Sequence, residues 1–273
     1  MSAEPFVSVI TVSLNAMHTI GDTLASVAQQ RCDFAFEHIC VDGGSVDGTR
    51  TLIDDWAARA AHIVRIYEPD TGIFDAMNKG LRAARGEYVL YLNADDFLVS
   101  QDSLARALAW LRPGDPGNPD LIVGHVAVGT PGAWGVWRHL RVPRLLGRLR
   151  GWGLFPLHQA QFTRRSQLAA VGGFRAALRS AADVIQYYEL ESKFRPRIRH
   201  LDQDVAFMRA GGKSNQGVGA RYRGVRELYG WLREGHGPVR SVVIATLKSL
   251  QTLVGVRIGR CRYRRWFAES HAR

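Results

Sequence analysis

The chain has 273 residues, of which 46% are hydrophobic and 22% charged, with 28 glycines and 10 prolines. This composition is typical of a globular protein with a sizeable core, and it excludes disordered, collagen-like and fibrous chains. The net charge of +11 divides into −8 over residues 1–137 and +19 over residues 138–273, so the acidic half can hold a cation while the basic half favours phosphate-bearing or anionic partners.

Strands and helices alternate through the first third of the chain. Short apolar, β-branched runs predict strands at residues 6–12, 38–42, 63–67 and 88–92. Apolar residues at helical spacing predict helices at residues 20–30, 49–61 and 73–85. This alternation is typical of an α/β protein whose mostly parallel sheet is flanked by helices.

The pattern becomes weaker in the second part of the chain. A turn-rich break at residues 112–120 (RPGDPGNPD) precedes a predicted strand at 121–128. We then expect a loop or mobile segment at 130–155, a strand near 159–163, a helix at 181–194, a strand near 205–208 and two helices from residue 222 onward. In the second of these helices Val243, Leu247, Leu250 and Val254 share one face, and they are followed by Arg257, Arg260, Arg262, Arg264 and Arg265.

The cysteines and the apolar segments indicate the cellular compartment. Cys32, Cys40 and Cys261 are an odd number without paired spacing, so neither a disulfide framework nor a thiolate metal site is expected, and a reducing compartment fits best. The first residues lack the regions of a signal peptide, and the apolar stretch at 242–256 is short and contains Lys248. We therefore expect a cytoplasmic protein with no signal peptide and no membrane span.

Polar side chains follow each of the first four predicted strands. The strands end at Ser13-Leu14-Asn15, Asp42-Gly43-Gly44, Glu68-Pro69-Asp70 and Asn93-Ala94-Asp95-Asp96. In an open parallel sheet the ligand binds beyond the carboxyl ends of the strands. Several carboxylates at one edge repel one another, and a divalent cation or a set of ligand hydroxyls relieves that repulsion. These strand ends therefore predict a binding site.

Each element has a simpler structural interpretation as well. Residues 42–49 (DGGSVDGT) can be a glycine-rich turn in which Asp47 caps a helix, and they lack the ending of a Walker loop. Residues 93–96 can be a solvated turn that caps the next helix. Because Mg²⁺ and Mn²⁺ are completed by substrate phosphates and water, one or two carboxylates suffice, and Asp95 is the predicted metal ligand.

The order of the motifs SVITVSLNA, CVDGGSVDGT, EPDTGIFDAMNKGLRAARGEY, YLNADD and LHQAQFTRR resembles the family 2 glycosyltransferases of GT-A fold, especially bacterial members that build cell-envelope glycans and glycolipids. The resemblance extends from residue 6 to about residue 214. It implies a GT-A catalytic domain at residues 1–219, with a nucleotide-sugar-binding half at 1–128 and an acceptor-binding half at 129–219. A basic helical extension follows at 220–273.

The resemblance also implies roles for individual residues. Asn15, Asp42, Asp70 and Lys79 would face the nucleotide or its phosphates. Asn93 and Asp95 take the first and third positions of the family's Asp-x-Asp metal motif, which leaves Asp95 as the carboxylate ligand. Asp183 is the implied catalytic base; Ile185 stands where relatives often carry a second acid, which leaves Glu189 as the alternative base. The other implied donor-side residues are Thr11, Ser13, Gly72, Asp75, Asn78, Ala94, Asp96, His158 and Gln159.

The implied reaction transfers a hexose from a nucleoside diphosphate sugar, most commonly a UDP-sugar, to an acceptor hydroxyl with inversion. Mg²⁺ or Mn²⁺ would assist, and the acceptor would be a glycan or a lipid-linked glycan. Two other classes are open at this point. A nucleotidyltransferase or an inactive sugar-nucleotide binder would share the sheet, and a nucleic-acid-binding protein would explain the net charge and the tryptophans among arginines. We expect no nucleic acid partner.

The basic tail suggests a membrane surface. An apolar helical face followed by five arginines, within residues 241–265, predicts docking on an anionic membrane, so the protein would be peripheral on the inner face of the cell membrane. The alternative is that this face packs on the catalytic domain.

Overall fold

The computed structural model describes residues 4–129, 136–140, 157–210, 217–236 and 256–260, together with residues 241, 242, 244 and 246. The strands are β1 (Val7–Ser13), β2 (Phe36–Asp42), β3 (Ile63–Tyr67), β4 (Tyr88–Tyr91), β5 (Phe97–Leu98), β6 (Leu121–Gly129), β7 (Val136–Leu140), β8 (Gln161–Arg164), β9 (Ile198–Arg209) and β10 (Val256–Arg260). The helices are α1 (Ile20–Ala28), α2 (Thr49–Ala57), α3 (Ile73–Ala83), α4 (Ser103–Leu108), α5 (Arg165–Ala170), α6 (Ala182–Phe194) and α7 (Gly217–His236), with a 3-10 turn at His158–Ala160.

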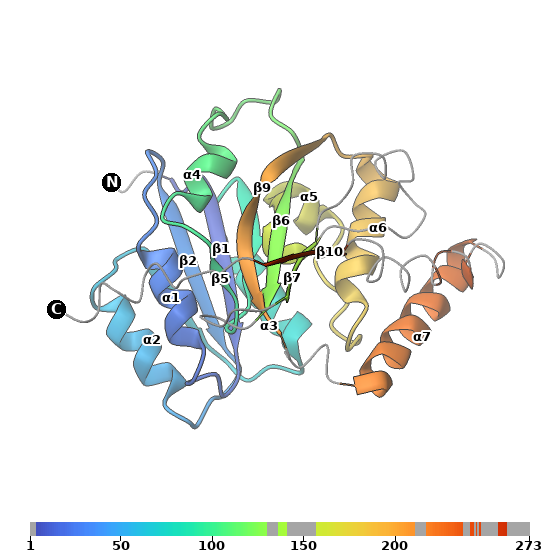
Figure 1. Cartoon of the computed structure of the whole chain (residues 1–273), viewed down its shortest axis with the longest axis horizontal. Coiled ribbons are helices and arrows are strands. Elements are labelled where there is room, and N and C mark those ends of the chain that lie inside the picture. Colours follow the sequence, from blue (N-terminus) through green and yellow to red (C-terminus); the bar gives the residue numbers. More distant parts are fainter. Residues whose placement is uncertain are drawn as a thin grey trace.

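These strands form one sheet in the order β10-β7-β6-β8-β4-β1-β2-β3, to which β9 is added beside β6 and β5 beside β9 (Figure 1). Strands β4, β1, β2 and β3 are parallel. Beyond β4 the pairing changes, because β8 is antiparallel to both β4 and β6. The predicted α/β class, with parallel strands flanked by helices in the first half of the chain, is confirmed.

Helices cover both faces of the parallel half because successive strand residues point to opposite faces. Ile39 and Val41 of β2 pack in one core cluster with Met77 of α3. Cys40, which lies between them, packs in another with Leu24 of α1 and residues of α2. In Figure 1 α1 and α2 lie at the left of the molecule, whereas α6 and α7 lie at the right. Helices therefore cover the faces of these parallel strands, and a ligand can bind beyond the strand ends.

The predicted elements of the first half agree with the structure to within a few residues, whereas two later ones differ. The strand predicted near 205–208 extends over the whole of β9. Its first half, IRHLDQD, lacks the apolar alternation that predicts a strand. This half is a strand because its backbone pairs with β6. β7 lies inside the segment predicted to be a loop, where it pairs with β6 and β10.

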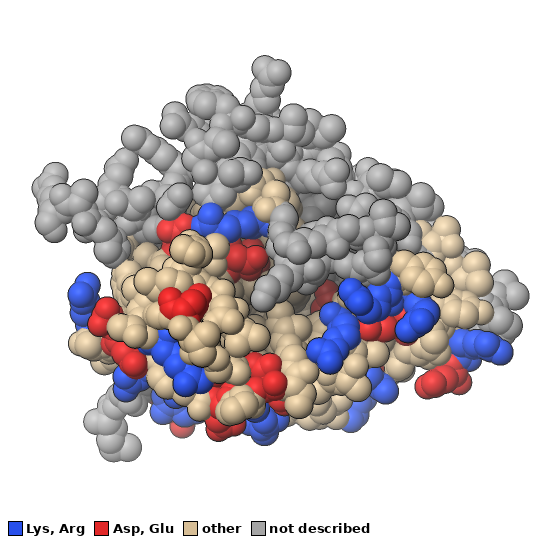
Figure 2. Space-filling view, turned by 90° about the horizontal axis from the view of Figure 1, so that it is seen from below, with Lys and Arg blue, Asp and Glu red and all other residues tan. Residues whose placement is uncertain are grey.

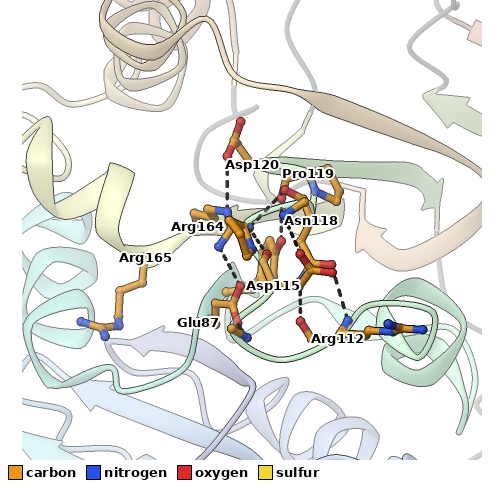
Figure 3. Close-up of polar contacts among 12 residues, drawn as sticks. Glu87, Arg112, Asp115, Asn118, Pro119, Asp120, Arg164 and Arg165 are labelled. Carbon is orange, nitrogen blue, oxygen red and sulfur yellow. Dashed lines mark hydrogen bonds and ion pairs between the residues drawn. The ribbon is translucent and has the colours of Figure 1, made fainter.

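The turn-rich break at 112–120 is an anchored loop (Figure 3). Arg164, at the end of β8, forms an ion pair with Glu87 at 2.7 Å and donates to the carbonyl oxygens of Asp115 and Asn118. The side-chain amide of Asn118 in turn donates to the Arg112 carbonyl oxygen at 2.7 Å. The cluster lies at the amino end of β4, so it holds the loop at the opposite edge of the sheet from the predicted site.

The C-terminal extension contributes a helix and a strand. Helix α7 begins at Gly217, and the predicted border at 219/220 therefore falls inside it. Strand β10 contains Arg257 and Arg260 and pairs with β7, where the sequence predicts only helices and a basic end. The apolar positions 243, 247, 250 and 254 and the arginines at 262, 264 and 265 lie outside the described residues.

Within the described ranges, no helix combines the length and the hydropathy needed to cross a membrane. On the face shown in Figure 2, basic and acidic side chains of the described residues are interspersed. The charge difference between the two halves of the sequence therefore does not produce one continuous basic surface over the part of this face that the structure describes.

Candidate active site

The carboxyl ends of β1, β2 and β3 lie side by side, as the sequence predicts. Ser13 and Asp42 are register partners, and so are Asp42 and Tyr67. The backbone pairing continues past the strands, because the Gly43 amide donates to the Ser13 carbonyl oxygen at 3.0 Å and the Glu68 amide to that of Asp42 at 3.2 Å. The loops after these three strands therefore form one continuous rim.

Asp42 is the buried centre of this rim. Its carboxylate accepts hydrogen bonds from Ser13 Oγ at 2.9 Å, from the Ser45 amide at 2.8 Å and from Arg50 Nε at 2.8 Å. Burial opposes ionisation of Asp42, but the hydrogen bonds from Ser45, Arg50 and Ser13 outweigh it and hold the pKa of Asp42 below its usual range. The ionised Asp42 therefore fixes the glycine-rich loop. Sequence reasoning missed Arg50, although its place in the first turn after that loop was a usable signal.

The loop after β3 approaches the loop after β2 very closely. A Cβ atom on Gly43 would lie 1.8 Å from Asp70 Oδ2, so only glycine fits there. Asp70 Oδ1 accepts from the Gly72 amide at 2.9 Å, and Gly72 has a φ of +150°. Lys79 donates to the Pro69 carbonyl oxygen and lies 3.6 Å from Glu68. These contacts place Asp70 and Lys79 beside the Asp42 loop.

Asn15 connects the loops after β1 and β2. It adopts a φ of +52°, its amide donates to Ser45 Oγ at 2.7 Å, and its Oδ1 accepts from the Val46 amide at 3.0 Å. Thr11 lies deeper, fully buried, with its hydroxyl 2.9 Å from His38 Nε2. Burial and nearby His62 lower the pKa of His38 to about 3, so this imidazole is neutral. Thr11 therefore supports β1 and β2 from inside the sheet.

Two residues predicted on the donor side hold other parts of the chain. The side-chain amide of Asn78 donates to the Phe174 carbonyl oxygen and accepts from the Phe174 amide, both at 2.7 Å. Asp75 accepts from the Thr71 amide at 3.0 Å, within the first turn of α3. Their donor-binding roles stay predictions, while the structure assigns both of them contacts that shape the loops around α3.

The segment after β4 brings distant residues together. Asp96, 1% exposed, accepts from Gln159 Nε2 at 3.1 Å and from the Arg209 amide at 3.2 Å. Burial and the neighbouring charge of Asp95 raise the pKa of Asp96 well above its usual value. Asp95 itself is partly exposed. Asp96 is therefore the buried carboxyl group of the pair, and it connects the segment after β4 with the turn at Gln159 and the end of β9. Asp95 is the accessible carboxylate, which can contact a ligand.

Asn93, His158 and Asp183 form a row across the site. Asn93 Nδ2 lies 3.4 Å from His158 Nε2, and His158 Nδ1 lies 3.8 Å from Asp183 Oδ2. The other carboxylate oxygen of Asp183 accepts from the Val184 amide at 2.8 Å in the first turn of α6. The predicted metal motif and the predicted base, far apart in sequence, are thus linked through one imidazole. The alternative base Glu189 lies further along α6 and pairs with Arg175 at 2.7 Å.

The residues at this row fit a cation that is completed by a ligand. No group of three or more His, Cys, Asp or Glu side chains among the described residues could hold a metal ion by itself. However, Asn93 Oδ1, Gln159 Oε1 and His158 Nδ1 are buried polar atoms without a hydrogen-bond partner. Such atoms need partners, and oxygen donors of this kind suit Mg²⁺ or Mn²⁺ whose other ligands are phosphates and water.

The sequence model described as "Glycosyl transferase family 2" matches residues 8–185. The chain belongs to the family 2 glycosyltransferases. A PGL/p-HBAD biosynthesis glycosyltransferase of Mycobacterium bovis is 34% identical over 183 residues, which are 66% of this chain and 68% of that protein. The protein TuaG of Bacillus subtilis, named for teichuronic acid biosynthesis, is 42% identical over 109 residues, 40% of this chain and 42% of its own.

Solved structures support the same fold. The first 349 residues of TarS from S. aureus, in complex with UDP-GlcNAc, superpose with a TM-score of 0.67 at 21% identity, covering 90% of this chain and 72% of that one. A mannosyltransferase from Pyrobaculum calidifontis, in complex with GDP-Man and Mn²⁺, superposes with a TM-score of 0.61 at 22% identity, covering 93% and 72%. This family 2 member therefore has the GT-A fold. Of the protein classes that the sequence left open, the comparisons select the glycosyltransferase.

Proposed function

We propose that this glycosyltransferase transfers a sugar from a nucleoside diphosphate sugar to an acceptor hydroxyl with inversion, and that Asp183 is its base. The observation that carries the proposal is the row Asn93, His158 and Asp183, which joins the end of β4 to the start of α6. In an inverting displacement the acceptor oxygen bonds to the anomeric carbon, the bond from that carbon to the diphosphate breaks, and the acceptor proton passes to a base. One carboxylate at the acceptor side therefore suffices.

The donor diphosphate would lie beside Asp95. Asp95 and the unpartnered Oδ1 of Asn93 are the residues that would hold Mg²⁺ or Mn²⁺. When bound, this cation neutralises the charge that develops on the departing diphosphate. The chain's own part is to keep Asp96 buried, so that Asp95 is the one accessible carboxylate of the pair that would hold the cation.

We propose a UDP-sugar as the donor, bound on the rim formed by the loops after β1, β2 and β3. Related folds take different nucleotides, since TarS holds UDP-GlcNAc and the mannosyltransferase holds GDP-Man. A thermal-shift screen against UDP, GDP and dTDP with Mn²⁺ or Mg²⁺ tests this choice. At a concentration of about 100 Kd a nucleotide stabilises the fold by about 2.7 kcal/mol. UDP should therefore raise the Tm most, and a larger shift with GDP or dTDP would replace the proposed donor.

Activity can be followed before the acceptor is known. Donor turnover is here the release of UDP from UDP-GlcNAc, or of GDP from GDP-mannose if the screen selects GDP, with water in place of the acceptor. Water must lose a proton to the same base, so donor turnover depends on Asp183 in the same way as transfer.

The proposed acceptor is a glycan or a lipid-linked glycan of the cell envelope. The relatives named for PGL/p-HBAD and teichuronic acid biosynthesis support this class. A lipid-linked acceptor is reached most easily from the membrane surface. Because β10 pairs with β7 and Ile244 packs in a core cluster with Leu228 of α7, we propose that the end of residues 241–265, which carries Arg262, Arg264 and Arg265, docks there from the cytoplasmic side.

Liposome co-sedimentation tests the membrane docking. Basic residues near an anionic leaflet contribute about 1 kcal/mol each, so the full chain should sediment with vesicles that contain phosphatidylglycerol at low salt and be released at high salt. A chain that ends at Gly237 keeps α7 and should stay in the supernatant. A variant with Arg262, Arg264 and Arg265 replaced by Gln should do the same. Equal sedimentation of all three proteins would contradict the docking and favour a tail that packs on the domain.

A further inference from the structure

Helix α7 from the C-terminal extension docks directly on the loop that precedes α6. Glu227 of α7 accepts hydrogen bonds from three consecutive backbone amides, those of Arg179 at 3.1 Å, Ser180 at 2.9 Å and Ala181 at 3.0 Å. Both oxygens of the Glu227 carboxylate therefore accept hydrogen bonds from the backbone of this loop. In Figure 1 α7 lies beside α6 at the right of the molecule.

This contact lies at the start of α6, where the usual side-chain cap is missing. The amides at the start of a helix have no partner inside the helix, and a Ser, Thr, Asp or Asn side chain normally satisfies one of them. Here the residue at the cap position is Ala181, which offers no side-chain acceptor, and Glu227 supplies one from another helix. Asp183 follows only two residues later, in the first turn. The position of the proposed base therefore depends on a carboxylate that belongs to α7.

A glycine on the same helix face allows α7 to approach the loop closely. Gly224 precedes Glu227 by one helical turn, and a Cβ atom on Gly224 would lie 3.3 Å from Ser180 Cβ. The rest of this face is apolar, since Leu228 and Leu232 pack in one core cluster with Ile185 of α6. Gly224, the Glu227 carboxylate and the two leucines therefore hold α7 against α6 in one arrangement.

The same loop also reaches the donor side. The Arg179 guanidinium lies 3.4 Å from the Thr71 carbonyl oxygen, and a Cβ atom on Gly72 would lie 3.3 Å from Arg179 Nη1. Residues 179–181 therefore lie between the loop after β3 and the first turn of α6. A shift of these residues changes the distance between the donor loop and Asp183.

We propose that Glu227 is a positioning residue: by binding the amides of residues 179–181 it holds Asp183 at the distance from the donor that turnover needs. This inference rests on the proposed role of Asp183 as the base. It assigns the C-terminal extension a function in catalysis that is separate from membrane docking.

Two variants of Glu227 test the proposal, with Glu234→Ala, an exposed position of the same helix, as control. Because a displacement of about 1 Å can lower a rate by about 10²-fold, Glu227→Ala should lower the kcat of donor turnover at least tenfold per nucleotide-binding site. The nucleotide Kd should stay within about twofold of the wild-type value. Glu227→Gln keeps one acceptor oxygen and should recover part of kcat. A purely structural role would lower the number of binding sites and leave kcat per site unchanged.

A glycine pair separates positioning from folding. Gly224→Ala and Gly230→Ala both replace a glycine of α7 by a better helix former, so neither should lower the Tm. Only the first meets a neighbour, because a Cβ atom on Gly230 has nothing within 4 Å. Gly224→Ala should therefore lower kcat per site severalfold, and Gly230→Ala should not change it.

Asp183→Asn, measured in parallel, distinguishes the two proposals. If Asp183→Asn is inactive while Glu227→Ala and Gly224→Ala keep wild-type kcat per site, the positioning role is wrong and the base assignment stands. If Asp183→Asn keeps wild-type turnover, the base assignment fails and the positioning role fails with it. Reduced kcat per site in both α7 variants, with both controls unchanged, supports the inference.

Discussion

Asp183→Asn is expected to lower donor turnover about 10²-fold or more while nucleotide binding and the fold stay intact. The amide keeps an oxygen that can accept from the Val184 amide, so the hydrogen bond in the first turn of α6 survives. The variant loses a negative charge near the start of a helix, which is worth about 1 kcal/mol or less. Stability and turnover should therefore respond very differently.

The measurement is kcat per nucleotide-binding site together with the Tm. Glu189→Gln is the matched control, because Glu189 is the other acidic candidate on α6 and its carboxylate is occupied by Arg175 at 2.7 Å. We expect Glu189→Gln to keep most of its turnover. Near-wild-type turnover of Asp183→Asn combined with an inactive Glu189→Gln would move the base to Glu189.

The parallel half of the fold could be predicted because its signals are local. Each of its strands is a short run rich in apolar and β-branched residues, and each helix shows its own periodicity. The meeting of Ser13 with Asp42 also follows from the sequence, because adjacent parallel strands that begin together end together. The predicted rim at the carboxyl edge needed no information about distant contacts.

The rest of the site depends on contacts between residues far apart in the chain. The Arg209 amide reaches Asp96 from 113 positions away, at the end of β9, whose polar first half gives no strand signal. Glu227 reaches the loop before α6 from a helix whose charged surface looks solvated in the sequence. Such roles depend on which backbone amides lie close to a carboxylate in the folded protein. The spacing of residues in the sequence does not predict these contacts.

The division of labour between Asp95 and Asp96 is likewise a consequence of burial. The two aspartates are adjacent in the sequence. The sequence alone favours Asp95 as the metal ligand only because of its place in the motif. In the structure Asp96 is enclosed by Gln159 and the Arg209 amide, and its raised pKa means that it tends to keep its proton. Asp95 is left as the charged group of the pair.

Asp95→Ala is therefore expected to abolish metal-dependent turnover, a loss of about 10²-fold or more, with the fold intact. In the wild type Mn²⁺ should tighten UDP binding, because the proposed role of Asp95 is to hold the cation beside the diphosphate. In Asp95→Ala the metal-free Kd for UDP should be unchanged and the gain from Mn²⁺ should be lost. Asn93→Ala should reduce that gain by less, since its amide oxygen is a neutral ligand.

Two properties of the site make this result interpretable. Burial and the Asp95 charge together raise the pKa of Asp96, so removing the Asp95 charge lowers the pKa of Asp96. A carboxylate that then forms at Asp96 is met by hydrogen bonds from Gln159, the Arg209 amide and Asn93. Asp102→Ala, which removes an exposed carboxylate outside the site, controls for a general loss of negative charge. Calorimetric titration of UDP with and without Mn²⁺ gives two Kd values for each protein, and each variant is compared with the wild type through these values. An equal gain from Mn²⁺ in Asp95→Ala and the wild type would show that the cation is held elsewhere, and the row of Asn93, His158 and Asp183 would then act without it.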